Sequence, residues 1–168
     1  QVIEKVLAKG QQVLVLVPEI GLTPQLIKRF QERFNIDLAI MHSGLTDRER
    51  FNGWLAARDG QAPIIIGTRS AVFTPMKNPG LVIIDEQHRF GVNQRAALRS
   101  KGTNPHLLVM TATPIPRSLA LTVYGDLDLT VIDEMPPGRQ IVETYVLLPR
   151  ERERAYRLIS REIEAGHQ

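Results

Sequence analysis

Five short apolar runs are spaced along the first two thirds of the chain. They occupy residues 13–17, 38–41, 64–66, 81–84 and 107–110. Each run consists of consecutive apolar residues and does not alternate with polar ones. This pattern is typical of strands buried on both faces, as in a parallel sheet. The sequence therefore predicts a parallel sheet built from these runs, and a further strand is expected over residues 129–132.

Segments with helical spacing lie between and after the runs. Gly10 supplies a stop for the first segment, Thr23 and Pro24 suit the cap and first position of the second, and Thr46 with Glu49 has the spacing of a capping box. Strands that alternate with helices indicate an α/β fold with helices on both faces of the sheet. The predicted helices cover residues 1–9, 24–34, 46–58, 93–99 and 117–124.

A proline-rich segment divides the chain. Pro136, Pro137 and Gly138 form the best linker candidate. We therefore predict a first domain over residues 1–134 and a linker over 135–140. Residues 141–168 then begin a second domain, with a strand at 141–148 and a charged helix at 150–165.

Composition narrows the class of protein. The chain has 168 residues, 43% hydrophobic content and a net charge of +3, so nucleic-acid binding is permitted but not required. It has no cysteine, which excludes disulfides and thiolate zinc sites in this segment and fits a reducing compartment. The apolar runs are too short to span a bilayer, and no signal peptide is evident. We expect a cytoplasmic protein without a membrane partner.

Two adjacent carboxylates, Asp85 and Glu86, follow the apolar run at 81–84. Ligands of parallel sheets bind beyond the carboxyl ends of the strands. We predict that Asp85 orients Mg²⁺, usually through water, and that Glu86 polarises the water that attacks a terminal phosphate. The alternative is an acidic pair that merely ends a strand at the surface.

Three further polar residues are candidates for the same site. His88 could hydrogen-bond toward Thr111 or Thr113, which follow the run at 107–110, and so report the state of the phosphate. The spacing of these residues relative to the acidic pair favours a nucleotide site over a surface cap.

Two loops are candidates for contact with nucleic-acid phosphates. Gly67, Thr68 and Arg69 combine close backbone approach with donors, and an ordinary turn is the alternative. Residues 18–25 join a strand end to a helix N-terminus that can receive a phosphate, with Pro18, Glu19 and Thr23 as the candidates. Both loops are expected on the same side of the sheet as Asp85.

The other conspicuous rings are expected to be structural. Trp54 lies at helical spacing with Phe51 and Leu55, which favours a place in the core over base stacking. The remaining histidines show no spacing suited to a metal, and we interpret them as structural or solvated: His42, His106 and His167.

Together these segments resemble the superfamily 2 helicases. The likeness rests on four motifs, at residues 18–25, 67–69, 85–88 and 111–113. It implies a RecA-like fold and the use of ATP, Mg²⁺ and DNA, with tracking along a single strand of forked or branched DNA. It also implies a partner in the remainder of the helicase, including a second RecA-like domain.

The resemblance divides between two helicase families. Residues 1–80, especially 15–25 and 66–71, are similar to the primosomal replication-restart helicases (PriA). Residues from 81 onward are similar to the branch-migration helicases (RecG), on the stretches 85–92, 110–117, 124–128 and 136–139. One hypothesis is a chimera of two homologous domains joined between about Ser70 and Asp85; a sequence error or a natural hybrid is the alternative.

One element of the family pattern is missing from this sequence. No Gly-x-x-x-x-Gly-Lys-Ser/Thr phosphate loop occurs in it, and the strand that carries the loop is missing with it. The leading interpretation is therefore a helicase fragment, acting in replication restart or in fork remodelling and recombination repair, that is inactive alone. Two alternatives are a non-enzymatic module that binds nucleic acid weakly, and an engineered chimera whose only property is folding.

Overall fold

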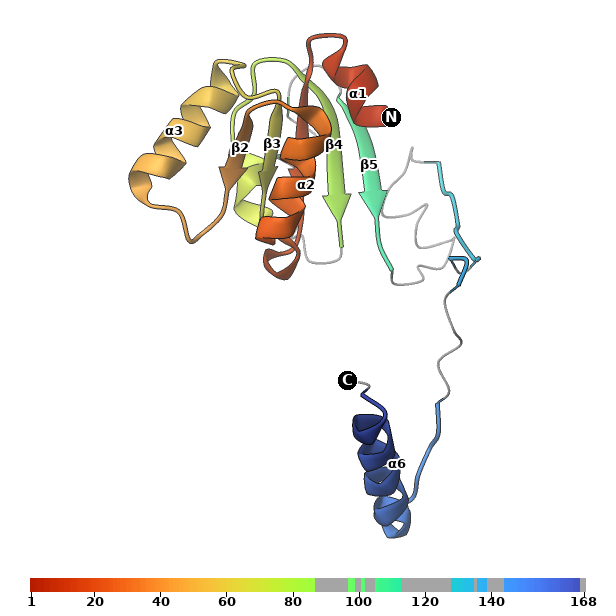
Figure 1. Cartoon of the computed structure of the whole chain (residues 1–168). Coiled ribbons are helices and arrows are strands. Elements are labelled where there is room, and N and C mark those ends of the chain that lie inside the picture. The colour runs from red at the N-terminus through yellow and green to blue at the C-terminus, as the bar shows by residue number, and fades with distance from the viewer. Residues whose placement is uncertain are drawn as a thin grey trace. The chain divides into compact units, whose positions relative to one another are not determined.

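The computed structural model describes residues 1–86, 97–98, 101, 105–112, 128–134, 136–138 and 144–166. The chain forms two compact units, Gln1–Leu119 and Ala120–Gln168. Within the described part of the first unit, five parallel strands form one sheet in the order β2-β3-β1-β4-β5 (Figure 1). Their bounds are Gln12–Leu16 for β1, Leu38–Met41 for β2, Ile64–Gly67 for β3, Pro79–Asp85 for β4 and His106–Met110 for β5.

The strands bury side chains on both faces, as the apolar runs predicted. Val13 and Val15 of β1 pack on the face covered by α1 (Val2–Leu7) and α2 (Pro24–Phe34). Leu14 and Leu16 pack on the opposite face with residues of α3 (Asp47–Arg58) and of the 3₁₀ helix η2 (Arg69–Phe73). The predicted α/β fold with helices on both faces is therefore confirmed.

The helix ends follow the predicted capping signals. The Leu26 amide donates to the Thr23 hydroxyl at 3.2 Å, and Pro24 opens α2. At α3, the Thr46 amide donates to a Glu49 carboxylate oxygen at 2.9 Å, while the Glu49 amide donates to the Thr46 hydroxyl at 3.3 Å. These reciprocal bonds form the predicted capping box and satisfy amides that have no partner within the helix.

A buried glutamine ties three parts of the first unit together. The Gln12 side-chain amide donates to the carbonyls of Ala57 at 2.9 Å and Ala62 at 2.8 Å. Its oxygen accepts from the amides of Lys77 at 2.7 Å and Asn78 at 3.1 Å. Gln12 is only 3% exposed, so these four bonds hold the end of α3 and the approach to β4 against β1. The apolar pattern did not predict this polar contact.

The predicted burial of two aromatic residues is wrong. Phe51 is 60% exposed and Trp54 is 36% exposed, although both lie on α3. The helix instead packs through small residues: Ala57 is fully buried, and Ala56 lies against the same core. The close approach of α3 to the sheet leaves no room there for large rings, which therefore stay at the surface.

The described residues of the second unit contain two helical segments and irregular chain. The 3₁₀ helix η4 (Pro149–Glu151) leads into α6 (Arg152–Glu164), as predicted for residues 150–165. The predicted strand at 129–132 is wrong: residues 128–134 are irregular and Ile132 is 90% exposed. Residues 144–148 are also irregular, contrary to the strand predicted there. Without a paired neighbour, a short apolar run has no ladder to hold it extended.

Other predicted elements lie outside the described residues. These include the helix at 117–124 and residues 141–143 of the last predicted strand, whereas Ala97 and Leu98 of the helix predicted at 93–99 are described as helical. Among the described helices, none has the length and apolar character needed to cross a membrane.

Candidate functional site

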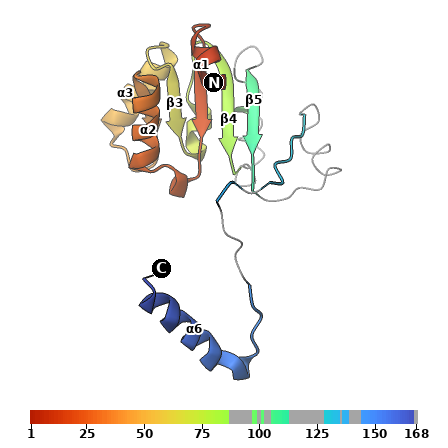
Figure 2. The ribbon, with the colours of Figure 1, turned by 45° about the vertical axis from the view of Figure 1, so that its right-hand side comes forward.

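The carboxyl ends of the strands are aligned along one edge of the sheet. Leu16 of β1 lies beside Gly67 of β3 on one side and Ile84 of β4 on the other. Asp85 in turn lies beside Met110 of β5. The labelled strand arrows point toward this edge in Figures 1 and 2, and the loops after β1 and β3 begin at it. The prediction that the loops after β1 and β3 lie on the same side of the sheet as Asp85 is confirmed.

The two carboxylates differ in backbone conformation. Asp85 is the last residue of β4 and is half-buried, whereas Glu86 has φ 52°. A left-handed conformation is uncommon for a residue with a side chain and costs on the order of 1–3 kcal/mol. Such strain is retained where the surrounding structure holds it, which is typical of functional sites. The strand therefore ends at Asp85, directly before the left-handed Glu86.

A hydroxyl follows the neighbouring strand. Because Asp85 is registered with Met110, Thr111 comes next to the Asp85–Glu86 turn along the edge. Thr111 is exposed. The other two residues predicted for this site, His88 and Thr113, lie outside the described residues, so their predicted roles stay predictions.

The loop after β3 is built around a glycine that cannot be replaced. A Cβ on Gly67 would collide with the Ala71 side chain and with the backbone and side chain of Met41. The next amide, on Thr68, donates to the Met41 carbonyl at 3.0 Å, and the Thr68 carbonyl accepts from Ala71 at 2.9 Å. The loop is therefore fixed against β2 by backbone contacts.

The residues predicted to contact phosphates in these two loops differ in burial. Thr68 is 3% exposed and Pro18 is buried, so these two side chains do not reach solvent, and Gly67, which has no side chain, is buried as well. Any contact that these three make with a ligand would have to come from the backbone, so the contacts expected from the sequence stay predictions. The exposed candidates at these two loops are Glu19, Thr23 and Arg69.

The loop after β1 leads into α2 through a 3₁₀ turn, η1 (Glu19–Gly21). The Gly21 amide donates to the Pro18 carbonyl at 2.8 Å, which closes this turn. Thr23 then caps α2, so its hydroxyl oxygen is already used as an acceptor while its proton remains a possible donor. The arrangement presents the N-terminus of α2 near the carboxyl edge.

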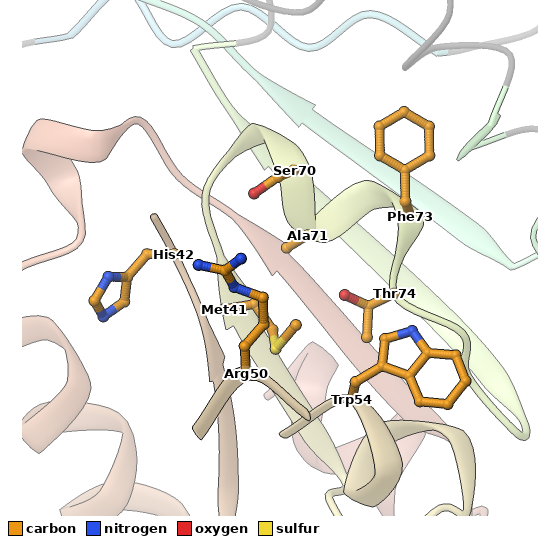
Figure 3. Close-up of a pocket in the computed structure, with 8 residues that line it drawn as sticks. All are labelled: Met41, His42, Arg50, Trp54, Ser70, Ala71, Phe73 and Thr74. Carbon is orange, nitrogen blue, oxygen red and sulfur yellow. The ribbon is translucent and has the colours of Figure 1, made fainter. Parts of the chain in front are cut away.

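A groove that the sequence did not predict lies between α3 and η2. It has a volume of about 200 Å³ (Figure 3). Its walls combine aromatic, hydroxyl and cationic groups from three elements. The lining residues are Met41, His42, Arg50, Trp54, Ser70, Ala71, Phe73 and Thr74. No signal in the sequence marks this groove, because the exposure of Trp54 and Phe73 depends on tertiary packing.

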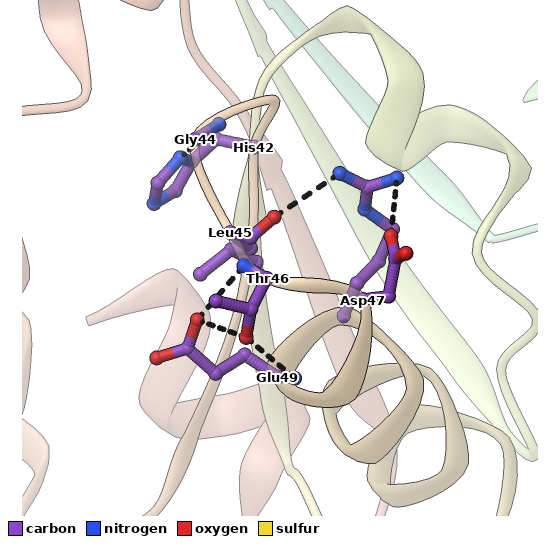
Figure 4. Close-up of polar contacts among 7 residues, drawn as sticks. His42, Gly44, Leu45, Thr46, Asp47 and Glu49 are labelled. Carbon is purple, nitrogen blue, oxygen red and sulfur yellow. Dashed lines mark hydrogen bonds and ion pairs between the residues drawn. The ribbon is translucent and has the colours of Figure 1, made fainter.

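Polar contacts hold one end of this groove (Figure 4). Arg50 donates to the Leu45 carbonyl at 3.3 Å and lies 3.8 Å from an Asp47 carboxylate oxygen. The Gly44 amide donates to His42 Nδ1 at 3.1 Å. In the adjoining capping box, the hydrogen bond from Thr46 lowers the pKa of Glu49 below its ordinary value. The β2–α3 loop is thus fixed by its own side chains.

A lysine lies behind η2. The Lys101 ammonium donates to the Thr74 carbonyl at 2.5 Å. Burial lowers the pKa of Lys101 to about 8, because desolvation disfavours the charged form. Lys101 therefore ties the segment before β5 to the end of η2.

Comparison with known proteins agrees with this geometry. The sequence profile described as DEAD/DEAH box helicase matches residues 1–122. RecG of Thermotoga maritima is 47% identical over 95% of this chain and 21% of its own length. The replication restart protein PriA of Haemophilus influenzae is 45% identical over 88% of this chain and 22% of its own length. The chain spans about a fifth of the length of these curated relatives.

Solved structures show the same fold. RecG bound to a three-way DNA junction superposes with a TM-score of 0.72 at 41% identity, covering 94% of this chain and 22% of that one. The helicase domain of Pyrococcus furiosus Hef, at 22% identity, covers 73% of this chain and 29% of that one with a TM-score of 0.56, which supports the fold alone.

The sheet and its carboxyl-edge loops define a RecA-like helicase fold. The chain belongs to the DEAD/DEAH box helicase family. The likenesses to RecG and to PriA both extend across residues 70–85, where a join between two parents was predicted. The join stays a prediction, which sequencing of the parent gene would test.

Proposed function

We propose that this chain is part of the motor of an ATP-dependent DNA helicase or translocase. In this proposal the motor acts on forked or branched DNA, in replication restart or in fork remodelling and recombination repair. One observation carries it: the acidic turn at Asp85 and Glu86 shares one sheet edge with the exposed Arg69. The solved complex of the similar RecG with a three-way DNA junction supports the branched substrate.

The acidic turn suits a magnesium-bound polyphosphate. Mg²⁺ prefers oxygen ligands and is typically bound through one or two carboxylates together with water and substrate phosphates. MgATP, when bound, supplies the phosphoanhydride bond that is cleaved. Asp85 would hold the ion through water, and Glu86 would accept a proton from the attacking water. The Thr111 hydroxyl, next along the edge, would contact a phosphate oxygen, as would that of Thr113. His88 would hydrogen-bond toward Thr111 or Thr113 and so report the state of the phosphate.

DNA would cross the loops after β3 and β1. Arg69 offers a guanidinium to a phosphate, and the N-terminus of α2 beside Thr23 offers amides. Glu19 would contact a sugar or base donor, because its carboxylate repels phosphate. With so few cations at these loops, DNA binding by this chain should be weak, and it should fall as salt is added.

The proposed organisation follows the linker. Residues 1–134 form part of a first RecA-like domain, 135–140 connect, and 141–168 begin a second. In this proposal the remainder of the helicase supplies the phosphate loop, whose lysine and backbone amides bind the ATP phosphates. The chain alone therefore does not turn over ATP. The cysteine-free sequence suits action in the cytoplasm.

Two measurements on the purified chain test this proposal. Mg²⁺-dependent ATP hydrolysis is measured with and without forked DNA, beside the Glu86→Gln variant, and DNA binding is followed by fluorescence anisotropy. We expect salt-sensitive DNA binding and no turnover above that of the variant. Turnover that DNA stimulates and Glu86→Gln abolishes would support the motor but contradict inactivity of the chain alone. Failure to bind DNA at low salt would contradict the proposed function.

A non-enzymatic module that binds nucleic acid weakly is the second candidate. The exposed Arg69 and the α2 N-terminus favour it, because they need no nucleotide in order to contact phosphate. MgATP discriminates between the two candidates. If the chain is part of a motor, MgATP added together with a segment that carries the phosphate loop should change the affinity of the chain for DNA. If the chain is a simple binding module, the affinity for DNA should not change.

A further inference from the structure

The groove between α3 and η2 combines features that suit a flat, unpaired ring. We propose that it receives one unpaired base of the DNA strand that crosses the β3–η2 loop. The inference rests on the DNA binding proposed above and adds a base-binding subsite to phosphate contacts.

Two exposed aromatic side chains contribute to the groove from different elements. Trp54 of α3 is 36% exposed and Phe73 of η2 is 61% exposed. Aromatic rings left in water at a concave site are typical of recognition surfaces. Bases stack on such rings with little dependence on sequence, because each base has a π-face.

The Trp54 ring is held in place before any ligand arrives. The Arg58 guanidinium lies 5.3 Å from the centre of the ring. Asp59 accepts two hydrogen bonds from Arg58, at 2.7 and 3.1 Å, which fix the guanidinium. A stacking partner that is already oriented loses less conformational entropy on binding.

The size and polar lining of the groove favour a base over a larger ligand. Its volume of about 200 Å³ is below the roughly 300–1,000 Å³ of sites for drug-sized molecules. The hydroxyl-bearing Ser70 and the guanidinium of Arg50 line it. Arg50 has five N–H donors, of which its contacts with Leu45 and Asp47 use a part, so donors remain for the edge of a base.

The position of the groove connects it with the predicted strand path. Arg69 begins η2, and the lining residues Ser70 and Phe73 follow it in the same short helix. A strand whose phosphate meets Arg69 therefore has the groove beside it. The phosphate contact would position the strand, and the groove would hold a base turned out from it.

A base-dependent fluorescence change is the first test. Trp54 is the single tryptophan of the chain, so its emission reports on this groove directly. A short oligothymidylate and an abasic oligonucleotide of the same length and charge are titrated at low salt. We expect quenching by the oligothymidylate alone, and roughly five- to a hundredfold weaker binding of the abasic strand.

Matched variants separate the groove from the phosphate contact. Phe73→Ala should bring the affinity for oligothymidylate down to that for the abasic strand. Phe51→Ala is the control, because Phe51 is 60% exposed on α3 but does not line the groove, and it should leave both affinities unchanged. Arg69→Ala should weaken both strands equally.

The outcomes distinguish this inference from the proposed function. Equal binding of both strands, or no effect of Phe73→Ala, would overturn the base site while leaving DNA binding intact. If neither strand binds in the anisotropy assay, the proposed function fails and the base site fails with it. Loss of oligothymidylate affinity in Phe73→Ala, without a change in its thermal unfolding temperature, would support the site.

Discussion

Strands β1 and β5 show how one sequence pattern can give two different environments. Each contains four apolar residues in a row, yet β1 is buried along its whole length. In β5, Leu107, Leu108 and Met110 are between 38 and 42% exposed. β1 pairs with β3 and β4, whereas β5 ends the strand order and pairs with β4 within the described residues. An apolar run therefore predicts a strand, and its neighbours decide how much of it is buried.

The largest expected effect is a difference in stability between matched substitutions in these strands. Leu14 of β1 is fully buried, so Leu14→Ala removes contacts and leaves a cavity, which should cost about 2–5 kcal/mol of the free energy of unfolding. Leu108 of β5 is 42% exposed, and Leu108→Ala should cost roughly 1 kcal/mol, since less apolar area returns to water. Urea unfolding of both variants measures the difference. Equal losses would contradict the contrast between the two strands.

A second effect concerns the polar contact at the start of β1. Gln12→Leu removes the hydrogen bonds that Gln12 makes with the amides of Lys77 and Asn78 and with the carbonyls of Ala57 and Ala62. Each unsatisfied buried group costs about 1–3 kcal/mol, and relaxation toward water reduces the sum, so we expect a loss of roughly 3 kcal/mol. Gln61→Leu, at an exposed position, is the control and should change the unfolding midpoint little. A loss no greater than that of the control would show that these bonds do not stabilise the fold.

A smaller effect should appear as a pH dependence near β5. The pKa of Lys101 is about 8, below its ordinary value of 10.5, so between these values the folded state binds fewer protons than the unfolded state. Stability should therefore rise with pH across this window. The side chain is partly exposed, so the rise should be only about 1 kcal/mol after solvent screening. The free energy of unfolding of the wild-type chain and of Lys101→Met is measured at about pH 7.5 and about pH 10, which lie near the two ends of this window.

Lys101→Met should flatten that rise, whereas Lys77→Met, at an exposed position, should leave it unchanged. A fall in wild-type stability over the same range, after correction with these variants, would contradict the burial of the Lys101 charge.

Local signals in the sequence predicted most of the first unit. The five strands followed from apolar runs, and α2 and α3 followed from the caps at Thr23 and Thr46, because these features act between near neighbours. The exposure of Trp54 was not predicted, since it depends on how closely α3 approaches the sheet. The strand expected at 129–132 was wrong because an apolar run also needs a neighbour with which to pair.

The sequence also predicted part of the candidate site. The placement of Asp85, Glu86 and the β3–η2 loop at one edge followed from the parallel sheet alone. The left-handed conformation of Glu86 and the burial of Thr68 did not, because they depend on tertiary packing. The groove beside η2 joins residues distant in the sequence, and no single motif marks it.

The central claim is that DNA crosses the carboxyl edge of the sheet at Arg69. The most direct measurement is the salt dependence of the affinity for forked DNA, compared between the wild-type chain and Arg69→Ala, with Arg29→Ala on the exposed surface of α2 as the control. Loss of one phosphate contact should weaken binding and reduce the slope of log K against log salt by about 0.9, while the control keeps the wild-type slope. An unchanged slope and affinity in Arg69→Ala would contradict the claim.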